Sequence, residues 1–187
     1  MNSAELEELL AQARLNTYRV HGDVRGADCV LAFSFGYIQA EAGIAPGLSN
    51  DDLAHYIERA LPGLPVIAQF DVADALGQRS AELIIRRHRT EGAYLDSQEV
   101  ARQAKDHMQA RGWKSVVVAT HPAMEARNDA LCTAMGLKTV APAGLEVIRY
   151  DPGSEQDWTR DPASWWKREA GVIVSINELG LLQRPHS

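Results

Sequence analysis

The sequence predicts an α/β fold in which helices cover both faces of a mostly parallel sheet. Strand-sized apolar runs alternate along the chain with segments of helical periodicity, which is the pattern of βαβ units. The apolar runs lack the polar–apolar alternation of a half-exposed strand, as is typical of strands buried on both faces. A length of 187 residues suits one such unit, so we expect residues 1–187 to form a single α/β domain.

Composition excludes several classes of protein. Hydrophobic residues make up 45% of the chain and charged residues 24%, which is typical of a folded domain. The net charge of −6 argues against non-specific binding of nucleic acid, which needs a basic face. Cys29 and Cys132 belong to no CxxC pair, so we expect two buried thiols in a reducing compartment. No secretory signal or membrane-spanning apolar run is found, so we expect a cytoplasmic protein without a membrane partner.

The first half of the chain contains two predicted strands and two predicted helices. Asn2 caps a helix that ends near Leu15, within an N-terminal helix and connector of residues 1–26. A buried strand at 28–35 (DCVLAFSF) is followed by a loop at 36–48. Ser49 then caps a helix with an apolar stripe, and a second buried strand follows at 66–70 (VIAQF). The stripe consists of Leu53, Ile57, Ala60 and Leu61.

Four further helices and three strands are predicted after residue 70. Residues 71–90 are expected to be helical in their second half, Asp96 caps a helix that Gly112 ends, and residues 115–119 (SVVVA) form a strand. Pro122 opens the next helix, whose expected core face is Ala123, Ala126, Ala130, Leu131 and Ala134. Short strands at 139–141 and 145–150, a polar loop at 151–162 and a helix capped by Ser164 complete the chain. The last helix has Trp166, Ala170, Ile173 and Ile176 on one side.

Ligands of parallel α/β sheets bind at the carboxyl ends of the strands, and three predicted strand ends carry polar residues. Gly36 either allows a ligand to approach the backbone or only turns the chain. No GxGxxG or P-loop pattern is present, so the standard dinucleotide and nucleoside triphosphate sites are not indicated. The polar residues are Ser34 after the first strand, Gln69, Asp71 and Asp74 after the second, and Thr120 and His121 after the third.

The segment 119–127 (ATHPAMEAR) is the most informative of these. The free N–H groups of a helix that starts at Pro122 form an anion site, to which Thr120 adds a hydroxyl, His121 a donor or base and Arg127 a fork for phosphate or carboxylate. The alternative is that His121 only caps the helix and Arg127 only pairs with a surface carboxylate. A second helix start, with Ser97 and Glu99, is either a capping box or a ligand contact.

Other site types are not indicated. HExxH motifs and Cys/His clusters are missing, so we expect no metal, and the lack of a GxSxG elbow argues against an ordinary α/β-hydrolase. Trp158, Trp165 and Trp166 form a cluster near the end of the chain. This cluster either packs in the core, forms a dimer patch, or stacks as a lid over a base.

The ThrHisPro-Ala-x-x-x-Arg segment after the VVVAT strand resembles the signature of the YdcF/SanA-like family, domain of unknown function 218. The AspSerGlnGlu helix start at 96–99, the buried strand at 28–35 and the late LysArgGlu at 167–169 are also similar, so the resemblance covers residues 27–182. It implies a three-layer Rossmann-like fold and S-adenosylmethionine as a candidate ligand, but no general reaction. Met124 and the short turn at 34–36 depart from the family pattern. The positions that match are Ser97, Glu99, Thr120, His121, Arg127 and Glu169.

Three functions remain open at this stage. The chain is a module that binds a small nucleotide-like or anionic ligand such as S-adenosylmethionine; an enzyme that acts on a phosphorylated or nucleotide-like molecule, with His121 as acid and base; or an interaction domain that uses its Trp-rich end. A homodimer is compatible with all three. The replacement of the family's His by Met124 and the polar strand ends favour the binding module.

Overall fold

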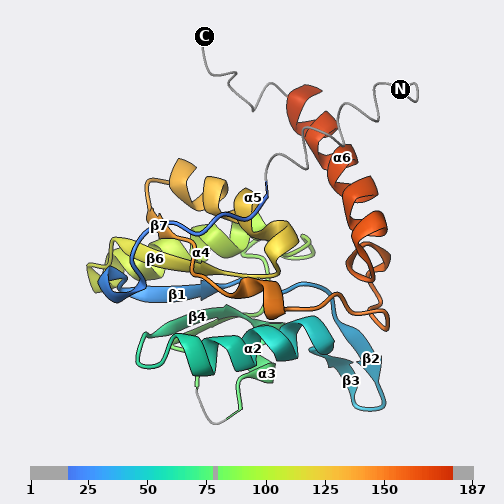
Figure 1. Ribbon diagram of the computed structural model, residues 1–187, viewed down its shortest axis with the longest axis horizontal. Helices are drawn as coiled ribbons and strands as arrows, with labels where there is room; N and C mark the ends of the chain where they lie inside the picture. Colours follow the sequence, from blue (N-terminus) through green and yellow to red (C-terminus); the bar gives the residue numbers. More distant parts are fainter. Residues whose placement is uncertain (1–16, 78–79, 179–187) are drawn as a thin grey trace.

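The computed structural model describes residues 17–77 and 80–178, and these contain a parallel sheet of five strands (Figure 1). The order in the sheet is β5-β4-β1-β6-β7, and every neighbouring pair is parallel. The predicted α/β class is therefore confirmed. The strands are β1 (Cys29–Ala32), β4 (Val66–Gln69), β5 (Leu83–Ile85), β6 (Ser115–Ala119) and β7 (Lys138–Val140).

Helices cover both faces of this sheet, as in a three-layer Rossmann-like fold. Helices α2 (Leu48–Ala60) and α3 (Phe70–Ala75) lie on one face, and α4 (Ser97–Arg111) and α5 (Pro122–Ala134) lie on the other (Figure 1). The chain starts in the middle at β1, proceeds outward through β4 and β5, and then crosses to β6 on the other side of β1. The strand order therefore reverses between β1 and β6, which is the position where sheets of this kind bind ligands.

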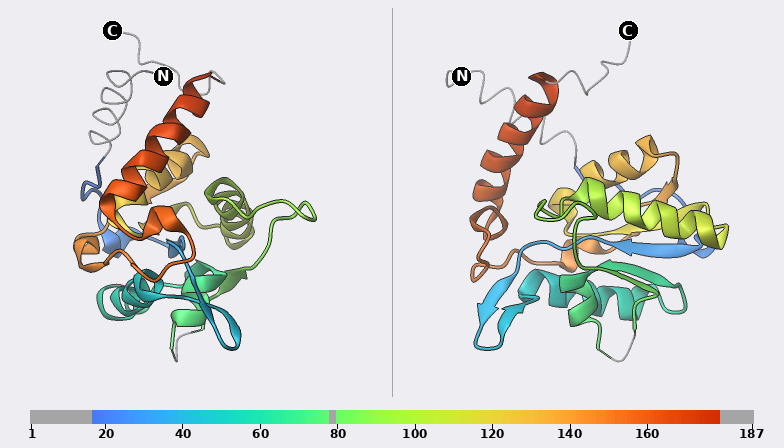
Figure 2. Two further views of the ribbon diagram at one scale, coloured as in Figure 1. Left: turned by 90° about the vertical axis from the view of Figure 1, so that its right-hand side faces the viewer. Right: turned by 180° about the vertical axis from the view of Figure 1, so that it is seen from behind.

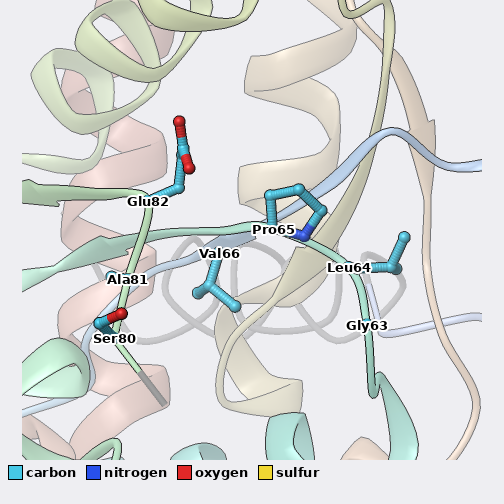
Figure 3. A pocket seen from close by; sticks show the side chains of 7 residues that line it. All are labelled: Gly63, Leu64, Pro65, Val66, Ser80, Ala81 and Glu82. Atoms are coloured by element: carbon cyan, nitrogen blue, oxygen red, sulfur yellow. The ribbon is translucent and has the colours of Figure 1, made fainter.

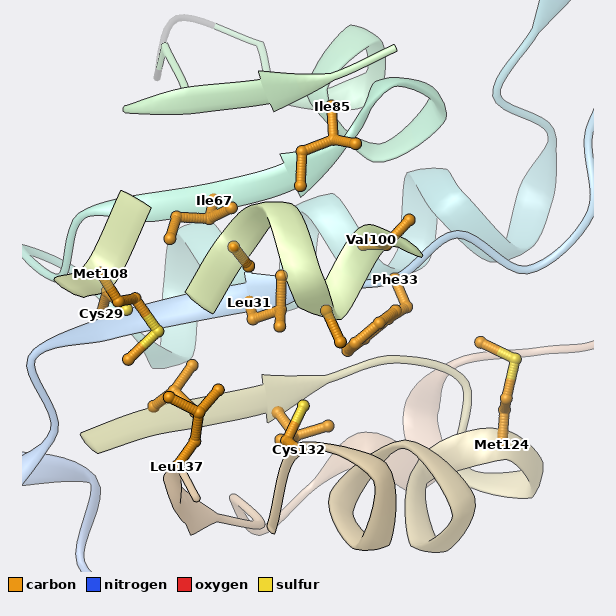
Figure 4. Packing of buried hydrophobic residues seen from close by; sticks show 14 of the residues in the cluster. Cys29, Leu31, Phe33, Ile67, Ile85, Val100, Met108, Met124, Cys132 and Leu137 are labelled. Carbon is orange, nitrogen blue, oxygen red and sulfur yellow. The ribbon is translucent and has the colours of Figure 1, made fainter. Parts of the chain in front are cut away.

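Successive residues of β1 point into opposite layers of the core. Val30 and Ala32 pack in the layer of α2, whereas Cys29 and Leu31 pack in the layer of α4 and α5. Figure 4 shows this second layer, where Cys132 of α5 also lies. Both faces of β1 are buried, which explains the continuous apolar run in the sequence. The two cysteines are free and buried, as the sequence predicted.

The structure contradicts the predicted helix between residues 71 and 90. The helical part is α3, in the first half, and the second half contains β5, which pairs with β4. Ile85 is 1% exposed and Ile84 is 39% exposed, so the two neighbours point to opposite sides, as in a strand. The apolar run of 83–85 is too short for its period to distinguish a strand from a helical turn.

Two other connections differ from the predictions. The loop at 36–48 contains a hairpin of β2 (Ile38–Ala40) and β3 (Gly43–Ala45), and the strand expected at 145–150 is a 3₁₀ helix, η2 (Leu145–Val147). Two more 3₁₀ turns, η1 (Val24–Gly26) and η3 (Asp157–Thr159), complete the short elements. Gly144 precedes η2 with φ at 93°, and this left-handed turn prevents an extended chain at that point.

The predicted caps are correct for α4 but wrong for α2 and α6. The Asp96 carboxylate accepts the Glu99 N–H, and Gly112 ends α4 in the left-handed conformation. Helix α2 begins after Gly47, so the Ser49 hydroxyl is free to donate to the Arg149 carbonyl. Helix α6 (Pro162–Glu178) is capped by Asp161, whose carboxylate accepts the N–H groups of residues 163 and 164. In both cases the cap lies upstream of the predicted serine.

The predicted core face of α5 is correct only in part, since Ala123 and Leu131 pack against the apolar cluster of the α4–α5 layer. Ala130 and Ala134 are exposed, and the buried side chains are Met124, Glu125, Asn128 and Cys132. Two polar residues lie in the buried stripe, so the pattern of apolar residues alone did not show which face of the helix is buried. On α2 the stripe is correct except for Ala60, which is exposed. The helix expected at 2–15 lies outside the described residues, as do the side chains of Ile173 and Ile176. Among the described residues, none of the helices has the length and apolarity needed to cross a membrane.

Candidate functional site

The carboxyl ends of β1 and β6 meet at a small aromatic cluster. The imidazole of His121, just after β6, stacks on the ring of Phe35, just after β1, with centroids 4.0 Å apart and planes at 11°. Tyr150 meets the same imidazole edge-on at 4.3 Å, and Trp165 of α6 lies 5.0 Å from Phe35. His121 is 1% exposed. The reversal point of the sheet is therefore filled and covered by aromatic rings.

Burial and one hydrogen bond determine which ring nitrogen of His121 carries a proton. Its Nδ1 atom accepts the N–H of Ala123 in the first turn of α5, at 3.1 Å. Burial lowers the pKa of His121 to about 3, so the ring is neutral at pH 7. A neutral imidazole that accepts at Nδ1 carries its proton on Nε2, and this buried Nε2 has no partner among the described residues. His121 is therefore both the helix cap and a buried donor without an acceptor.

Two more polar groups of the same region lack partners. Thr120 Oγ1, on the residue that follows β6, and the indole Nε1 of Trp165 are buried and make no hydrogen bond within the described part of the chain. Each such group costs about 1–3 kcal/mol relative to a satisfied one. Three such unsatisfied groups lie close together, on Thr120 and His121 between β6 and α5 and on Trp165 of α6. This number is unusual for side chains that serve only to pack the core.

Asp71 supplies an acceptor on the other side of β1. It lies in the first turn of α3, directly after β4, and is 4% exposed. Burial raises its pKa to about 6, although a hydrogen bond from Ser34 opposes this shift. Its Oδ1 has no partner among the described residues. The backbone N–H of Ser34 also donates to the side chain of Gln69, so Ser34 is bonded both to the last residue of β4 and to Asp71 after it.

Arg127 forms an ion pair that joins α5 to α6. Its guanidinium donates to the Glu169 carboxylate at 2.9 Å and lies over the ring of Trp165 at 5.5 Å. Burial raises the pKa of Glu169, and the charge of Arg127 opposes that shift. Arg127, which the sequence analysis proposed as an anion-binding residue, therefore already pairs with the carboxylate of Glu169. The partner, Glu169, is another site residue suggested by the family resemblance, and the pair joins the first half of α6 to α5.

Glu99 and Ser97 lie at the start of α4, where the capping interaction is formed. The carboxylate of Glu99 is 2% exposed and accepts from Arg89 Nε at 2.7 Å and from Gln103 at 2.9 Å. The bond from Arg89 is the main reason that the pKa of Glu99 falls to about 2. Glu99 is therefore an anion held by a cation, without the protonation change that an acid–base group needs. Ser97 is partly exposed beside it.

Gly36 adopts a left-handed backbone conformation and lies close to Ser154 and Thr159 in the segment before α6. Its φ is 79°, and a Cβ atom there would lie 2.5 Å from both Ser154 Oγ and Thr159 Oγ1. Ser154 and Thr159 are buried and hydrogen-bond to each other at 2.7 Å. The missing side chain of Gly36 thus makes room for the segment that leads to α6.

Sequence reasoning missed two polar residues on the buried face of α5. Glu125 is 1% exposed and Asn128 is 0% exposed, and Glu125 Oε1 and both amide atoms of Asn128 lack partners among the described residues. Burial, with a smaller contribution from Asp129, raises the pKa of Glu125 to about 8. The available signal was their spacing from His121, since residues 121, 125 and 128 share one helical face.

The three tryptophans pack inward. Trp165 is 1% exposed, and Trp158 and Trp166 are half-buried against the apolar cluster of the α4–α5 layer. Arg168 lies over the ring of Trp158 at 4.6 Å. Of the alternatives drawn from the sequence, core packing describes Trp165, whose ring also covers the aromatic cluster.

Two surface depressions lie away from this cluster. One, of about 350 Å³, is at the amino end of β4, where Pro65 and Val66 face Ser80 and Glu82 (Figure 3). The other, of about 620 Å³, lies between α4 and α5, where Arg102 and Lys105 face Met135. Neither is lined by Asp71, Thr120 or His121. In residues 17–77 and 80–178, no three His, Cys, Asp or Glu side chains gather in a way that could hold a metal ion.

Comparisons of this chain with protein-family models, with curated proteins and with solved structures give no match.

Proposed function

We propose that this chain binds a small nucleotide-like ligand at the point where the strand order reverses, between the carboxyl ends of β1 and β6. The observation that carries the proposal is the set of buried, unpartnered polar atoms on both sides of β1: Asp71 Oδ1, Thr120 Oγ1 and His121 Nε2. Unsatisfied buried polar atoms destabilise a protein, and here they occupy the position where doubly wound sheets bind ligands. Ligand atoms that complete these hydrogen bonds would account for their retention.

The chemistry of these atoms suits the sugar and base of a nucleoside. His121 Nε2 is a neutral donor, Thr120 Oγ1 donates or accepts, and Asp71 is an acceptor above pH 6. Sugar hydroxyls and ring nitrogens need this mixture of donors and acceptors.

An anionic group of the ligand would bind by exchange. The N–H groups of Ala123 and Met124 at the start of α5 are already bonded to His121, and Arg127 is bonded to Glu169. A phosphate or carboxylate would replace Glu169 as the partner of Arg127. S-adenosylmethionine, the ligand implied by the family resemblance, carries both an adenosine and a carboxylate and is therefore an apt probe.

Entry of a ligand requires movement of Tyr150 and Trp165, the two side chains that cover His121 and Phe35 and are called the cover below. Tyr150 and Trp165 lie against His121 and Phe35, and α6 extends from this cover away from the body of the molecule (Figure 2). The ion pair between Arg127 and Glu169 is one described tether of α6 to α5. An incoming anion that competes for Arg127 would therefore also release the cover.

A second candidate function is catalysis with Asp71 as general base. Its pKa of about 6 lies near physiological pH, as an efficient base requires. His121 suits this role poorly, because its pKa is about 3 and its buried Nε2 already carries the proton. His121 would instead donate a hydrogen bond to the reacting molecule. A fall in kcat in Asp71→Asn, measured with substrate at saturation so that weaker binding plays no part, would identify this function.

A thermal-shift screen tests binding, with adenosine, AMP, S-adenosylmethionine and ribose 5-phosphate as probes. A probe at 100 times its Kd stabilises the folded state by about 2.7 kcal/mol, which raises the Tm of a chain of this size by roughly 5–10 °C. Thr120→Val removes one hydroxyl of the site at nearly constant volume, and Thr133→Val does the same on the exposed side of α5. We expect Thr120→Val alone to weaken binding. Equal affinity in the two variants would contradict the proposed location.

A further inference from the structure

The unpartnered polar atoms continue beyond the reversal point along the inner face of α5. Glu125 follows His121 by one helical turn and Asn128 follows Glu125 by another, so the three side chains are neighbours on one face. Glu125 Oε1, Asn128 Oδ1 and Asn128 Nδ2 are buried without a partner among the described residues. Together with His121 Nε2 they line the inner side of two successive turns of the helix.

Glu125 and Asn128 each present one hydrogen-bond donor and one acceptor to the interior, and this pattern limits the ligands that can bind them. The carboxyl group of Glu125 is protonated at pH 7, because burial raises its pKa to about 8, so it offers an O–H donor and a carbonyl acceptor. The Asn128 amide offers an N–H donor and a carbonyl acceptor. The pair carries no net charge, so it is poorly matched to a phosphate or an ammonium group. A planar group with an adjacent donor and acceptor, such as the edge of a nucleobase or a carboxamide, fits it.

The position of the pair argues against a purely structural role. Met124 and Cys132 are buried on the same helix, so apolar side chains are accommodated there. Replacing buried polar groups that have no partner by apolar groups of similar shape is close to neutral or stabilising. Glu125 and Asn128 are therefore costly choices for packing alone, in contrast to Glu99, whose carboxylate is fully bonded to Arg89 and Gln103.

We propose that Glu125 and Asn128 recognise the donor–acceptor edge of a nucleobase or similar planar amide, while Asp71, Thr120 and His121 hold the adjoining sugar. This inference rests on the proposed function, because it extends the same site. It assigns base selectivity to α5, one to two turns beyond His121.

The test compares two probes that differ only by the base. Titration calorimetry gives the Kd of AMP and of ribose 5-phosphate for the wild-type chain and for Glu125→Met, Asn128→Leu and Glu125→Gln. The Gln variant keeps a neutral donor and acceptor and guards against a general effect of substitution at this position. Thr133→Val, on the exposed side of the same helix, is the control.

We expect the wild-type chain to prefer AMP, and Glu125→Met and Asn128→Leu to lose this preference by about tenfold or more, with ribose 5-phosphate affinity unchanged and the Tm of the free protein raised. Glu125→Gln and Thr133→Val should keep most of this preference. An unchanged ratio of the two affinities in Glu125→Met and Asn128→Leu would overturn the inference and leave the proposed function intact. Failure of both probes to bind the wild-type chain would overturn both.

Discussion

The imidazole of His121 stacks on the phenyl ring of Phe35 at a centroid distance of 4.0 Å, and this contact joins the two strands between which the sheet reverses its order. Phe35 follows β1 and His121 follows β6, so the stack closes the place where a ligand would enter. Burial keeps the His121 imidazole neutral, and the hydrogen bond that its Nδ1 accepts from the Ala123 N–H orients it. Its free donor, Nε2, therefore belongs to the interior of the site.

His121 is expected to stay neutral far below the usual pKa of histidine. Its pKa of about 3 in the folded state is depressed relative to 6.5 in the unfolded chain. The unfolded state therefore binds more protons between pH 3 and 6.5, so the His121 contribution to stability is present above pH 6.5 and declines as the pH falls through this window. ¹⁵N NMR of labelled histidine should show the Nε2–H tautomer at pH 5. An imidazolium signal for His121 at pH 5 would contradict this account.

Glu125 should produce the opposite slope at higher pH. Its pKa of about 8 when folded exceeds 4.5 in the unfolded chain, so the folded state binds more protons between these values. Its contribution is complete below pH 4.5 and is lost as the pH rises through 8. We expect the free energy of unfolding to fall by about 1 kcal/mol between pH 7 and 8, and Glu125→Gln to remove this decline. Urea titrations at both pH values provide the measurement, and an equal decline in Glu125→Gln would refute it.

Gly36→Ala should destabilise the fold more than a comparable change at Gly92. Both glycines have positive φ, 79° and 74°, but only Gly36 would place a Cβ atom 2.5 Å from Ser154 and Thr159. Gly92 has open space around it. We expect Gly92→Ala to cost about 1 kcal/mol of backbone strain and Gly36→Ala about 2–4 kcal/mol, because overpacking adds to the strain. Chemical denaturation measures the difference, and equal costs would mean that the neighbours move aside.

The Arg127–Glu169 pair should behave as a buried tether. The side chain of Glu169 is 9% exposed and that of Arg127 is 28% exposed. Arg127 Nη1 lies 2.9 Å from Glu169 Oε2. Arg127→Met alone leaves a buried carboxylate and should cost about 2–4 kcal/mol, whereas the double change with Glu169→Leu should recover most of this loss. A double-mutant cycle in urea tests the coupling. Additive losses in the cycle would show that the pair does not fasten α6.

The sheet was predictable because its strands are buried on both faces. The strands β1, β4 and β6 each contain three or more consecutive apolar residues without polar–apolar alternation, and their parallel pairing is confirmed. The strand β5 was missed because Ile84 is exposed and only Ile85 is buried, so three residues showed no period of their own. The N-cap of α4 was correct since Asp96 and Glu99 supply a local signal.

The site was predictable only in part, because its partners are distant in sequence. Thr120, His121 and Asp71 follow strands and were expected at the carboxyl edge of the sheet. The partnership of Arg127 with Glu169 spans 42 positions, and the covering of His121 by Tyr150 and Trp165 depends on how α6 packs. Local spacing carries no information about such contacts. Whether Ser34, Gly36, Ser97 and the other candidates contact a ligand stays a prediction.

The central claim, that the unpartnered atoms between β1 and β6 are ligand contacts, is tested most directly by the affinity of AMP and S-adenosylmethionine for the wild-type chain and for Thr120→Val and Asp71→Asn. Thr120→Val removes a hydroxyl of the site, and Asp71→Asn replaces one acceptor oxygen by an N–H donor and removes the charge, both with little change in volume. The account predicts saturable binding by the wild-type chain and a loss of about tenfold or more in each variant, with Thr133→Val unchanged. Binding that is equally tight in all four proteins, or no binding of either probe to the wild-type chain, would contradict it.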